Sequence, residues 1–299
     1  MNKPIKALVL YVLGVFAIGV FTAYPVSLLL PLLGATGAEF HSVLTRVLKL
    51  LAVLGLVPVL VYLGVNDRAH WGFGTTRNRF VRQVIVGLII GALSMGVVAG
   101  ALLLLGVRVD HTAVTFTFLE VVWLTVRISI AALIIGVLEE AWIRGALYSA
   151  LDKALTAAGA VLVTAALFSI VHFLKGDASM DPSEPGWLSG VSVLASTLTE
   201  LVRVENADSA LALFIGGVFL ALARYKTGSV AVCIGIHAGW VIVIKLTKAG
   251  TRLDHDAEWA WLAGNYDGFI GYLGAAWLLV LVIAYYWRYV RTTQSTGQV

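Results

Sequence analysis

The sequence predicts an all-α polytopic membrane protein: a single bundle of about eight transmembrane helices, plus one further helix at the membrane interface or across it. Three observations support this fold class. Hydrophobic residues make up 60% of the 299-residue chain and charged residues only 13%, a balance outside the range of soluble globular proteins. The apolar residues are also grouped into runs of about 20, the length that a helix needs to cross the hydrocarbon core.

Eight such runs follow one another along the chain, and each is predicted to be a span. They lie at 7–32, 43–63, 84–105, 121–150, 157–174, 210–223, 230–246 and 269–287. The stretch 187–202 is apolar but interleaved with Ser, Thr and Glu, so it fits either an interfacial helix or a ninth crossing. No repeat or linker divides the chain. We therefore expect residues 1–299 to form one integral membrane domain.

The distribution of basic residues predicts the orientation of the bundle. Lys and Arg predominate in the N-terminal segment, the 66–83 loop, the turns at 152–156 and 224–228, and the C-terminal segment, whereas most acidic residues lie in the alternate connections. By the positive-inside rule both termini are expected in the cytoplasm. The plasma (inner) membrane of a bacterium is the expected location.

Small and aromatic residues predict how the helices pack and where they meet the interface. Glycines at four-residue spacing let helix backbones approach closely; these pairs are Gly87 and Gly91, Gly96 and Gly100, and Gly235 and Gly239. Trp259, Trp261 and Tyr266 stand among charges in the 247–267 connection, which is typical of an interfacial aromatic belt.

The sequence Glu-Glu-Ala-Trp-Ile-Arg at 139–144 places three ionisable side chains within the fourth apolar run. A charge near the bilayer centre costs roughly 2.5 to 3.5 kcal/mol even on lenient scales, so such residues pair with one another or serve a function. Glu140 precedes Arg144 by four residues, the order and spacing of a helical ion pair. Glu139 lies about a quarter-turn away and is predicted to be the carboxylate available for chemistry.

Two histidines, His172 and His237, also lie in apolar runs. If the hairpin between the fourth and fifth spans turns near Thr156, then Glu139 and His172 are each about 16 residues, or roughly 24 Å, from the turn and share a depth. The same helical rise places His237 roughly 10 Å shallower. A carboxylate and an imidazole are the groups needed to deprotonate a water and hold it against a carbonyl.

Two histidines and a carboxylate are also a set that binds zinc. The chain has no His-Glu-x-x-His sequence, which is the helical zinc signature. We therefore predict no metal and no other cofactor, with zinc as the alternative.

Three motifs, in this order, resemble those of the CAAX prenyl endopeptidase and bacteriocin-processing (CPBP) family of intramembrane proteases, and they define a core at about 121–246. They are Glu139-Glu140-x-x-x-Arg144-Gly145-x-Leu147, Phe168-x-x-x-His172, and Thr227-Gly228-Ser229 leading to His237-Ala238. The resemblance implies an endopeptidase in which Glu139 activates water, His172 is its partner and His237 lies on the oxyanion side. Glu140, Arg144 and Phe168 are expected to support these residues.

The implied mechanism is of the glutamate type without metal, although members of the family have been labelled metalloproteases. The implied substrate is a peptide or a membrane-tethered protein, and no nucleic-acid partner is expected.

One position departs from the family pattern. The third motif usually closes with Asn four residues after the histidine, and here that residue is Val241, which cannot donate a hydrogen bond. Trp240 is the nearest donor in sequence. Two alternatives to proteolysis stay open: a weakened or inactive member that binds membrane partners or confers immunity, which Val241 favours, and a proton-coupled transporter, which would also bury Glu and His.

Overall fold

The computed structural model is almost entirely helical and describes residues 3–34, 37–111, 116–173, 181–201, 203–264 and 266–290. Its longer helices are α1 (Lys3–Leu29), α2 (Phe40–Leu63), α3 (Arg77–Leu104), α4 (Phe118–Glu140), α5 (Tyr148–Ala154), α6 (Ala157–Phe173), α7 (Ser189–Leu201), α8 (Ala207–Thr227), α9 (Ala231–Gly250) and α10 (Tyr272–Tyr285). A π-helix, Ala141–Leu147, joins α4 to α5. Another, Tyr286–Val290, follows α10, and single 3-10 turns lie at Pro31–Leu33, Val204–Asn206 and Ala260–Leu262.

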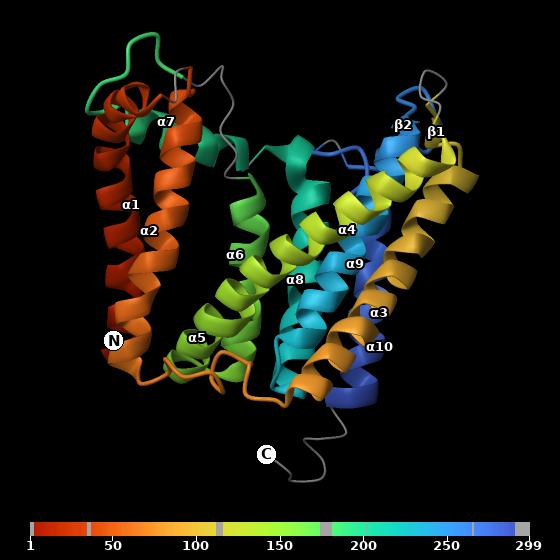
Figure 1. The fold of residues 1–299 in the computed structure, drawn as a ribbon, viewed down its shortest axis with the longest axis horizontal. Helices are drawn as coiled ribbons and strands as arrows, with labels where there is room; N and C mark the ends of the chain where they lie inside the picture. The colour runs from red at the N-terminus through yellow and green to blue at the C-terminus, as the bar shows by residue number, and fades with distance from the viewer. Residues whose placement is uncertain are drawn as a thin grey trace.

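The all-α polytopic membrane fold is confirmed. Within the described residues six helices are long and apolar enough to cross a membrane, the segment from α4 through α5 counting as one, and α6 and α10 are shorter apolar helices. These helices coincide with the eight runs read from the sequence. The helix α7 has 13 residues, a length of about 20 Å at the α-helical rise, too short to cross, and it lies over one end of α1 and α2 (Figure 1). This favours the interfacial alternative.

The helices form two groups that α5 and α7 connect (Figure 1). In the first, α1 packs against α2. In the second, α9 contacts α3, α4 and α8, while α6 and α10 pack on α8. The helix α4 runs diagonally across this second group. The strands β1 (Arg108–Asp110) and β2 (Thr251–Leu253) pair antiparallel at the end opposite to the start of α1.

Glycines set the distance between α3 and α9. A Cβ added at Gly91 would lie 2.2 Å from the carbonyl oxygen of Ile236, and one at Gly235 would lie 2.1 Å from a backbone oxygen of α3. The two backbones therefore touch, as predicted for these pairs. The prediction is wrong for the pair at 96 and 100, where an added Cβ would meet no atom within 4 Å.

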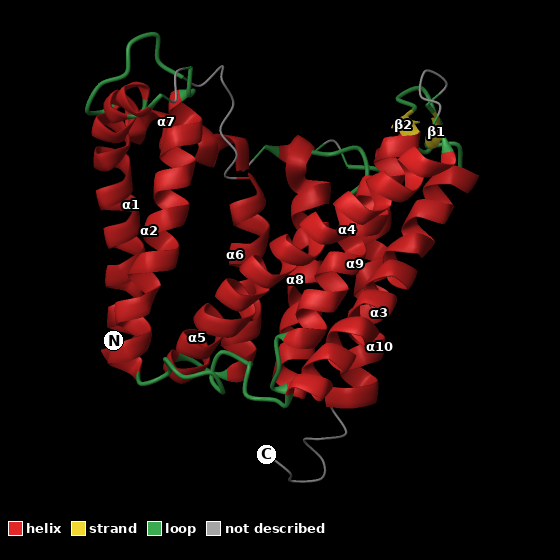
Figure 2. Cartoon of the chain, viewed as in Figure 1, coloured by secondary structure: helices red, strands yellow, loops and turns green. Residues whose placement is uncertain are grey.

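The connection between α2 and α3 closes one end of the bundle, the end at which α1 begins (Figure 2). The carbonyl of His70 accepts hydrogen bonds from the hydroxyl of Ser149 and from the guanidinium of Arg224. The carbonyl of Gly72 accepts one from the backbone N–H of Val230. This connection is therefore fixed to α5, to α8 and to the start of α9.

Candidate functional site

The core of the candidate site is an ion pair between Glu140, the last residue of α4, and Arg144 in the π-helix. A guanidinium nitrogen of Arg144 lies 2.9 Å from Oε1 of Glu140, and both side chains are 0% exposed. Arg144 also donates to the carbonyl of Gly217 at 3.2 Å, and its guanidinium lies 4.3 Å from the centre of the Phe168 ring. The predicted pairing of Glu140 with Arg144 is confirmed.

His237 of α9 lies between the two glutamates. Its Nδ1 is 2.8 Å from Oε1 of Glu140, and its Nε2 is 3.9 Å from Oε2 of Glu139. Because Glu140 is paired with a guanidinium and is therefore an ionised acceptor, Nδ1 of His237 is the donor in the shorter contact. This hydrogen bond directs Nε2 towards Glu139.

The two glutamates differ in their access to the outside of the bundle. The side chain of Glu139 is 38% exposed, whereas that of Glu140 is 0% exposed. The carboxylate of Glu139 has no direct hydrogen bond at Oε2. Glu139 can therefore meet a water or a substrate, whereas Glu140 is held inside the bundle.

His172 lies one residue before the end of α6 and is connected to the rest of the site through Phe168. Its Nδ1 donates to the carbonyl of Phe168 at 2.7 Å, which orients the imidazole. The Phe168 ring makes edge contacts with His172 and with His237, at centroid distances of 4.6 and 5.7 Å. Phe168 thus touches both histidines as well as Arg144.

The sequence placed His237 roughly 10 Å shallower than Glu139 by the helical rise, and this was wrong, because the two side chains lie 3.9 Å apart. The equal depth of Glu139 and His172 stays a prediction. The calculation assumed helices of equal tilt. In Figure 1, α4 crosses the bundle diagonally while α6 runs nearly parallel to α1 and α2, so each residue of α4 advances less along the bundle than each residue of α6.

Trp240, the sequence-based candidate for an oxyanion donor, already donates its hydrogen bond to another residue. Its single N–H donates to the hydroxyl of Ser94 at 2.9 Å, in a buried contact between α9 and α3. An indole has only one donor, so Trp240 positions α9 against α3 and does not face a substrate. Neither Trp240 nor Val241 therefore offers a free side-chain donor at this position.

Unpartnered polar atoms gather around the motif at 139–144. Among the described residues, six buried side-chain N or O atoms have no hydrogen-bond partner, and the members in this motif are Oε2 of Glu139, Oε2 of Glu140, Nε1 of Trp142 and Nε of Arg144. Buried polar groups are nearly always hydrogen-bonded, so such a concentration marks a place where water or a ligand takes part. The indole N–H of Trp142 is a donor that the sequence reasoning did not single out.

Arg224 of α8 supports the site through its hydrogen bonds, a role that was not predicted from the sequence. It was counted among the cytoplasmic loop charges, yet it is 7% exposed. Its Nε donates to the carbonyl of Arg144 at 3.0 Å and another nitrogen to the carbonyl of His70 at 2.7 Å. A buried guanidinium is stabilised by such fixed acceptors, and here it ties the π-helix to the α2–α3 connection.

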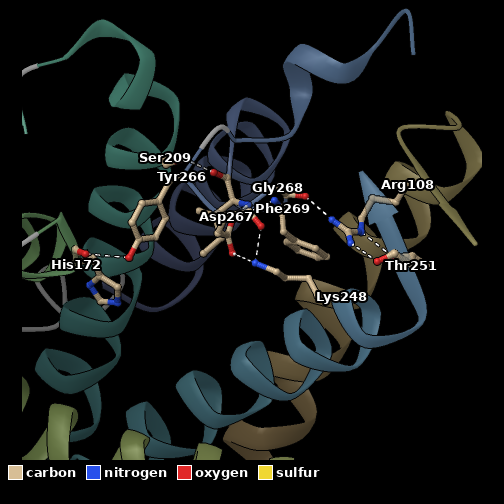
Figure 3. Close-up of polar contacts among 10 residues, drawn as sticks. Arg108, His172, Ser209, Lys248, Thr251, Tyr266, Asp267, Gly268 and Phe269 are labelled. Atoms are coloured by element: carbon tan, nitrogen blue, oxygen red, sulfur yellow. Dashed lines mark hydrogen bonds and ion pairs between the residues drawn. The ribbon is translucent and has the colours of Figure 1, made fainter. Parts of the chain in front are cut away.

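Tyr266 reaches the site from the opposite end of the bundle. It was expected in an interfacial aromatic belt, but its hydroxyl donates to the carbonyl of His172 at 2.9 Å, and its ring packs on Phe173 at a centroid distance of 4.8 Å. The last carbonyls of a helix have no partner within the helix, so Tyr266 satisfies one of them at the end of α6 (Figure 3). The two tryptophans of the expected belt, Trp259 and Trp261, are 40% and 57% exposed.

The segment around Tyr266 is itself fixed by a polar network (Figure 3). Asp267 accepts the backbone N–H groups of Phe269 and Ile270 and lies 3.3 Å from the ammonium of Lys248. Arg108 of β1 donates to the carbonyl of Gly268. The network connects the α6 terminus with α9 and the two-stranded sheet.

In the described ranges no three His, Cys, Asp or Glu side chains are arranged to hold a metal ion. The independence from metal stays a prediction.

Residues 121–243, which carry all three motifs, match the model of a family described as type II CAAX prenyl endopeptidase Rce1-like. This part of the chain therefore resembles the Rce1-like family. The resemblance inferred from the motifs is therefore confirmed over residues 121–243. The Rce1-like region includes Glu139, His172 and His237 but ends before Tyr266. Comparisons with curated proteins and with solved structures returned no match.

Proposed function

We propose that this protein is an intramembrane endopeptidase in which Glu139 is the general base that activates the hydrolytic water. The observation that carries the proposal is the arrangement of Glu139, Glu140 and His237: a buried ion pair orients an imidazole towards a second, accessible carboxylate. The match to the Rce1-like family supports a protease. The roles of the individual residues rest on this geometry.

The proposed hydrolytic water bridges Glu139 and His237. The two facing atoms are 3.9 Å apart, so a water can lie at about 2.8 Å from both, an ordinary hydrogen-bonding distance. With Nδ1 of His237 donating to Glu140, the neutral imidazole has its lone pair on Nε2. The water then donates one proton to Glu139 and the other to His237, and its oxygen lone pairs point away from both.

In the chemical step, this oxygen attacks the peptide carbonyl while Glu139 takes the proton that the water loses. A carbon–oxygen bond forms and the carbonyl becomes an oxyanion. The protonated Glu139 then gives its proton to the leaving nitrogen as the carbon–nitrogen bond breaks. Water is consumed, and the products are a carboxylate and an amine.

The oxyanion needs a donor other than the family's Asn. We assign this role to the indole N–H of Trp142, which is buried, has no partner and stands three residues after Glu139 in the sequence. His172, held by Phe168 and Tyr266, would lie beside the substrate as a second imidazole. Loss of one oxyanion donor reduces kcat by about 10²- to 10³-fold in a well-studied protease, and Trp142→Phe is expected to do the same.

The substrate class follows from the family and the setting: a peptide or a membrane-tethered protein, with prenylated C-terminal peptides as the first compounds to test. We propose that both termini face the cytoplasm, which is the orientation that the positive-inside rule favours. The plasma membrane of a bacterium is the proposed location.

The test is cleavage by the purified full chain in lipid vesicles. A quenched fluorescent peptide carrying a prenylated Cys and two aliphatic residues near its C-terminus should be cut by the unaltered protein, and in ¹⁸O-water the new carboxylate should carry one ¹⁸O. Cleavage should disappear in Glu139→Gln. Folded protein that cuts no peptide, but that can be photo-crosslinked to the same peptides, would instead support the second candidate, a binding protein, which Val241 favours.

A further inference from the structure

An apolar groove lies between α1 and α2, apart from the site described above. Its volume is about 770 Å³, and residues of these two helices alone line it. It opens to the outside of the bundle, since Leu10, Ile18 and Tyr62 along it are 59%, 53% and 63% exposed. In Figure 1 the α1–α2 pair stands at the side of the molecule away from α9 and α3.

Gly14 leaves open space on the α1 side of the groove, whereas at Gly55 the ring of Tyr11 would lie 3.3 Å from an added Cβ. Gly14 of α1 lines it, and a Cβ added there would meet no atom within 4 Å. Gly55 lines it from α2. Further along the same helix pair, at Gly19, an added Cβ would lie 2.4 Å from Leu48, so the two helices are in tight contact there and separate towards the start of α1.

The charge of the groove is confined to one end. Lys3 and Lys6 belong to its lining, which contains no acidic residue. Both lysines lie at the start of α1, beside Tyr62 near the end of α2. A basic end followed by an apolar channel matches an anionic headgroup followed by an acyl chain.

The length of the groove matches one leaflet of a bilayer. From Lys3 to Ile18 the helix rises by about 22 Å. Half the thickness of a bilayer, headgroups included, is also about 20 to 22 Å. An acyl chain in the groove would therefore run from the lysines to the region of the midplane, where α1 and α2 close on each other.

We propose that this groove binds one anionic phospholipid of the leaflet at the α1 end, with the phosphate at Lys3 and Lys6 and an acyl chain along Gly14. The occupant is a lipid of the surrounding membrane and not the peptide that the candidate site would cleave. The proposal does not depend on the proposed proteolysis.

Three variants of the full chain test it. Lys3→Gln/Lys6→Gln removes the charges. Gly14→Phe fills the channel at a position where a side chain has room. Arg77→Gln/Arg79→Gln, in the first turn of α3 at the same end of the bundle, is the matched control, because it removes the same number of exposed charges outside the groove.

The measurement is native mass spectrometry of detergent-solubilised protein titrated with phosphatidylglycerol or with phosphatidylcholine of identical chains. The unaltered protein should bind one phosphatidylglycerol in preference to phosphatidylcholine. Lys3→Gln/Lys6→Gln should weaken phosphatidylglycerol binding by about thirtyfold, since each basic residue near an anionic surface contributes about fivefold. Gly14→Phe should abolish binding of both lipids, and the control should bind as the unaltered protein does.

Equal binding of the two lipids by the unaltered protein would overturn the proposal. An equal loss of phosphatidylglycerol binding in the control variant would also overturn it, because the lipid would then respond to charge anywhere at this end of the bundle. Binding that survives in Gly14→Phe would overturn the assignment of the groove as the place of the chain.

Discussion

Replacing each glutamate of the pair in turn should separate stability from catalysis. Oε1 of Glu140 accepts from both Arg144 and His237, and none of the three side chains is more than 6% exposed. Removing one partner of a buried ion pair costs about 3 to 5 kcal/mol, because the other charge stays buried without compensation. At about 2 to 4 °C per kcal/mol, Glu140→Gln should lower the Tm by roughly 6 to 20 °C.

Glu139→Gln should leave the fold almost unchanged. Glu139 is 38% exposed, and its contact with His237 is 3.9 Å long, so the free energy of unfolding should change by less than about 1 kcal/mol. Cleavage should nevertheless fall by about 10² to 10⁴, the contribution of a general base.

Both variants would be purified in detergent and compared by thermal unfolding and by cleavage of the fluorescent peptide. Glu120→Gln is the control: it is the same substitution in α4, at an exposed capping box with Thr117, and it should keep full activity. If Glu139→Gln stays active while Glu140→Gln is stable and inactive, the two roles are reversed. Full cleavage by both variants would refute the endopeptidase reasoning.

Three further outcomes are expected. Gly91→Leu should sharply reduce the yield of monodisperse protein in size-exclusion chromatography, because its Cβ would lie 2.2 Å from the Ile236 carbonyl oxygen. Gly96→Leu should be tolerated, because nothing lies within 4 Å of an added Cβ there. Equal yields of the two variants would contradict the backbone contact. Tyr266→Phe keeps the ring but loses the hydrogen bond to the His172 carbonyl. The free energy of unfolding should therefore fall by only about 1 kcal/mol, while kcat falls and KM is unchanged. An unaltered kcat would show that Tyr266 does not position the end of α6. Activity should survive a metal chelator; a loss that zinc restores would show that the reaction needs metal.

The features predicted correctly from the sequence depend on local pattern. The length of an apolar run determines whether a helix can span, so the eight runs coincide with helices of the structure. The pair of Glu140 and Arg144 depends only on a spacing of four residues, and it too could be predicted.

The features that were missed depend on the relative orientation of helices. The diagonal course of α4 brings Glu139 to His237 of α9. The inward direction of Arg224 and Tyr266 depends on backbone carbonyls supplied by other segments of the chain. Such acceptors leave no signal in the sequence, because every residue has a carbonyl.

The glycine contacts of α9 restrict how the molecule can move. Where backbones touch without intervening side chains, helices have little freedom to slide, and this holds between α9 and α3 and also at Gly136 of α4, whose added Cβ would lie 3.1 Å from the carbonyl of Ile234. Glu139 and His237 are therefore carried by one rigid body. His172 is carried by α6, which makes a contact of the same kind with α8: a Cβ added at Gly217 would lie 2.8 Å from the Cα of Ala165. Glu139 and His237 would consequently keep their relative position in any opening that admits a peptide.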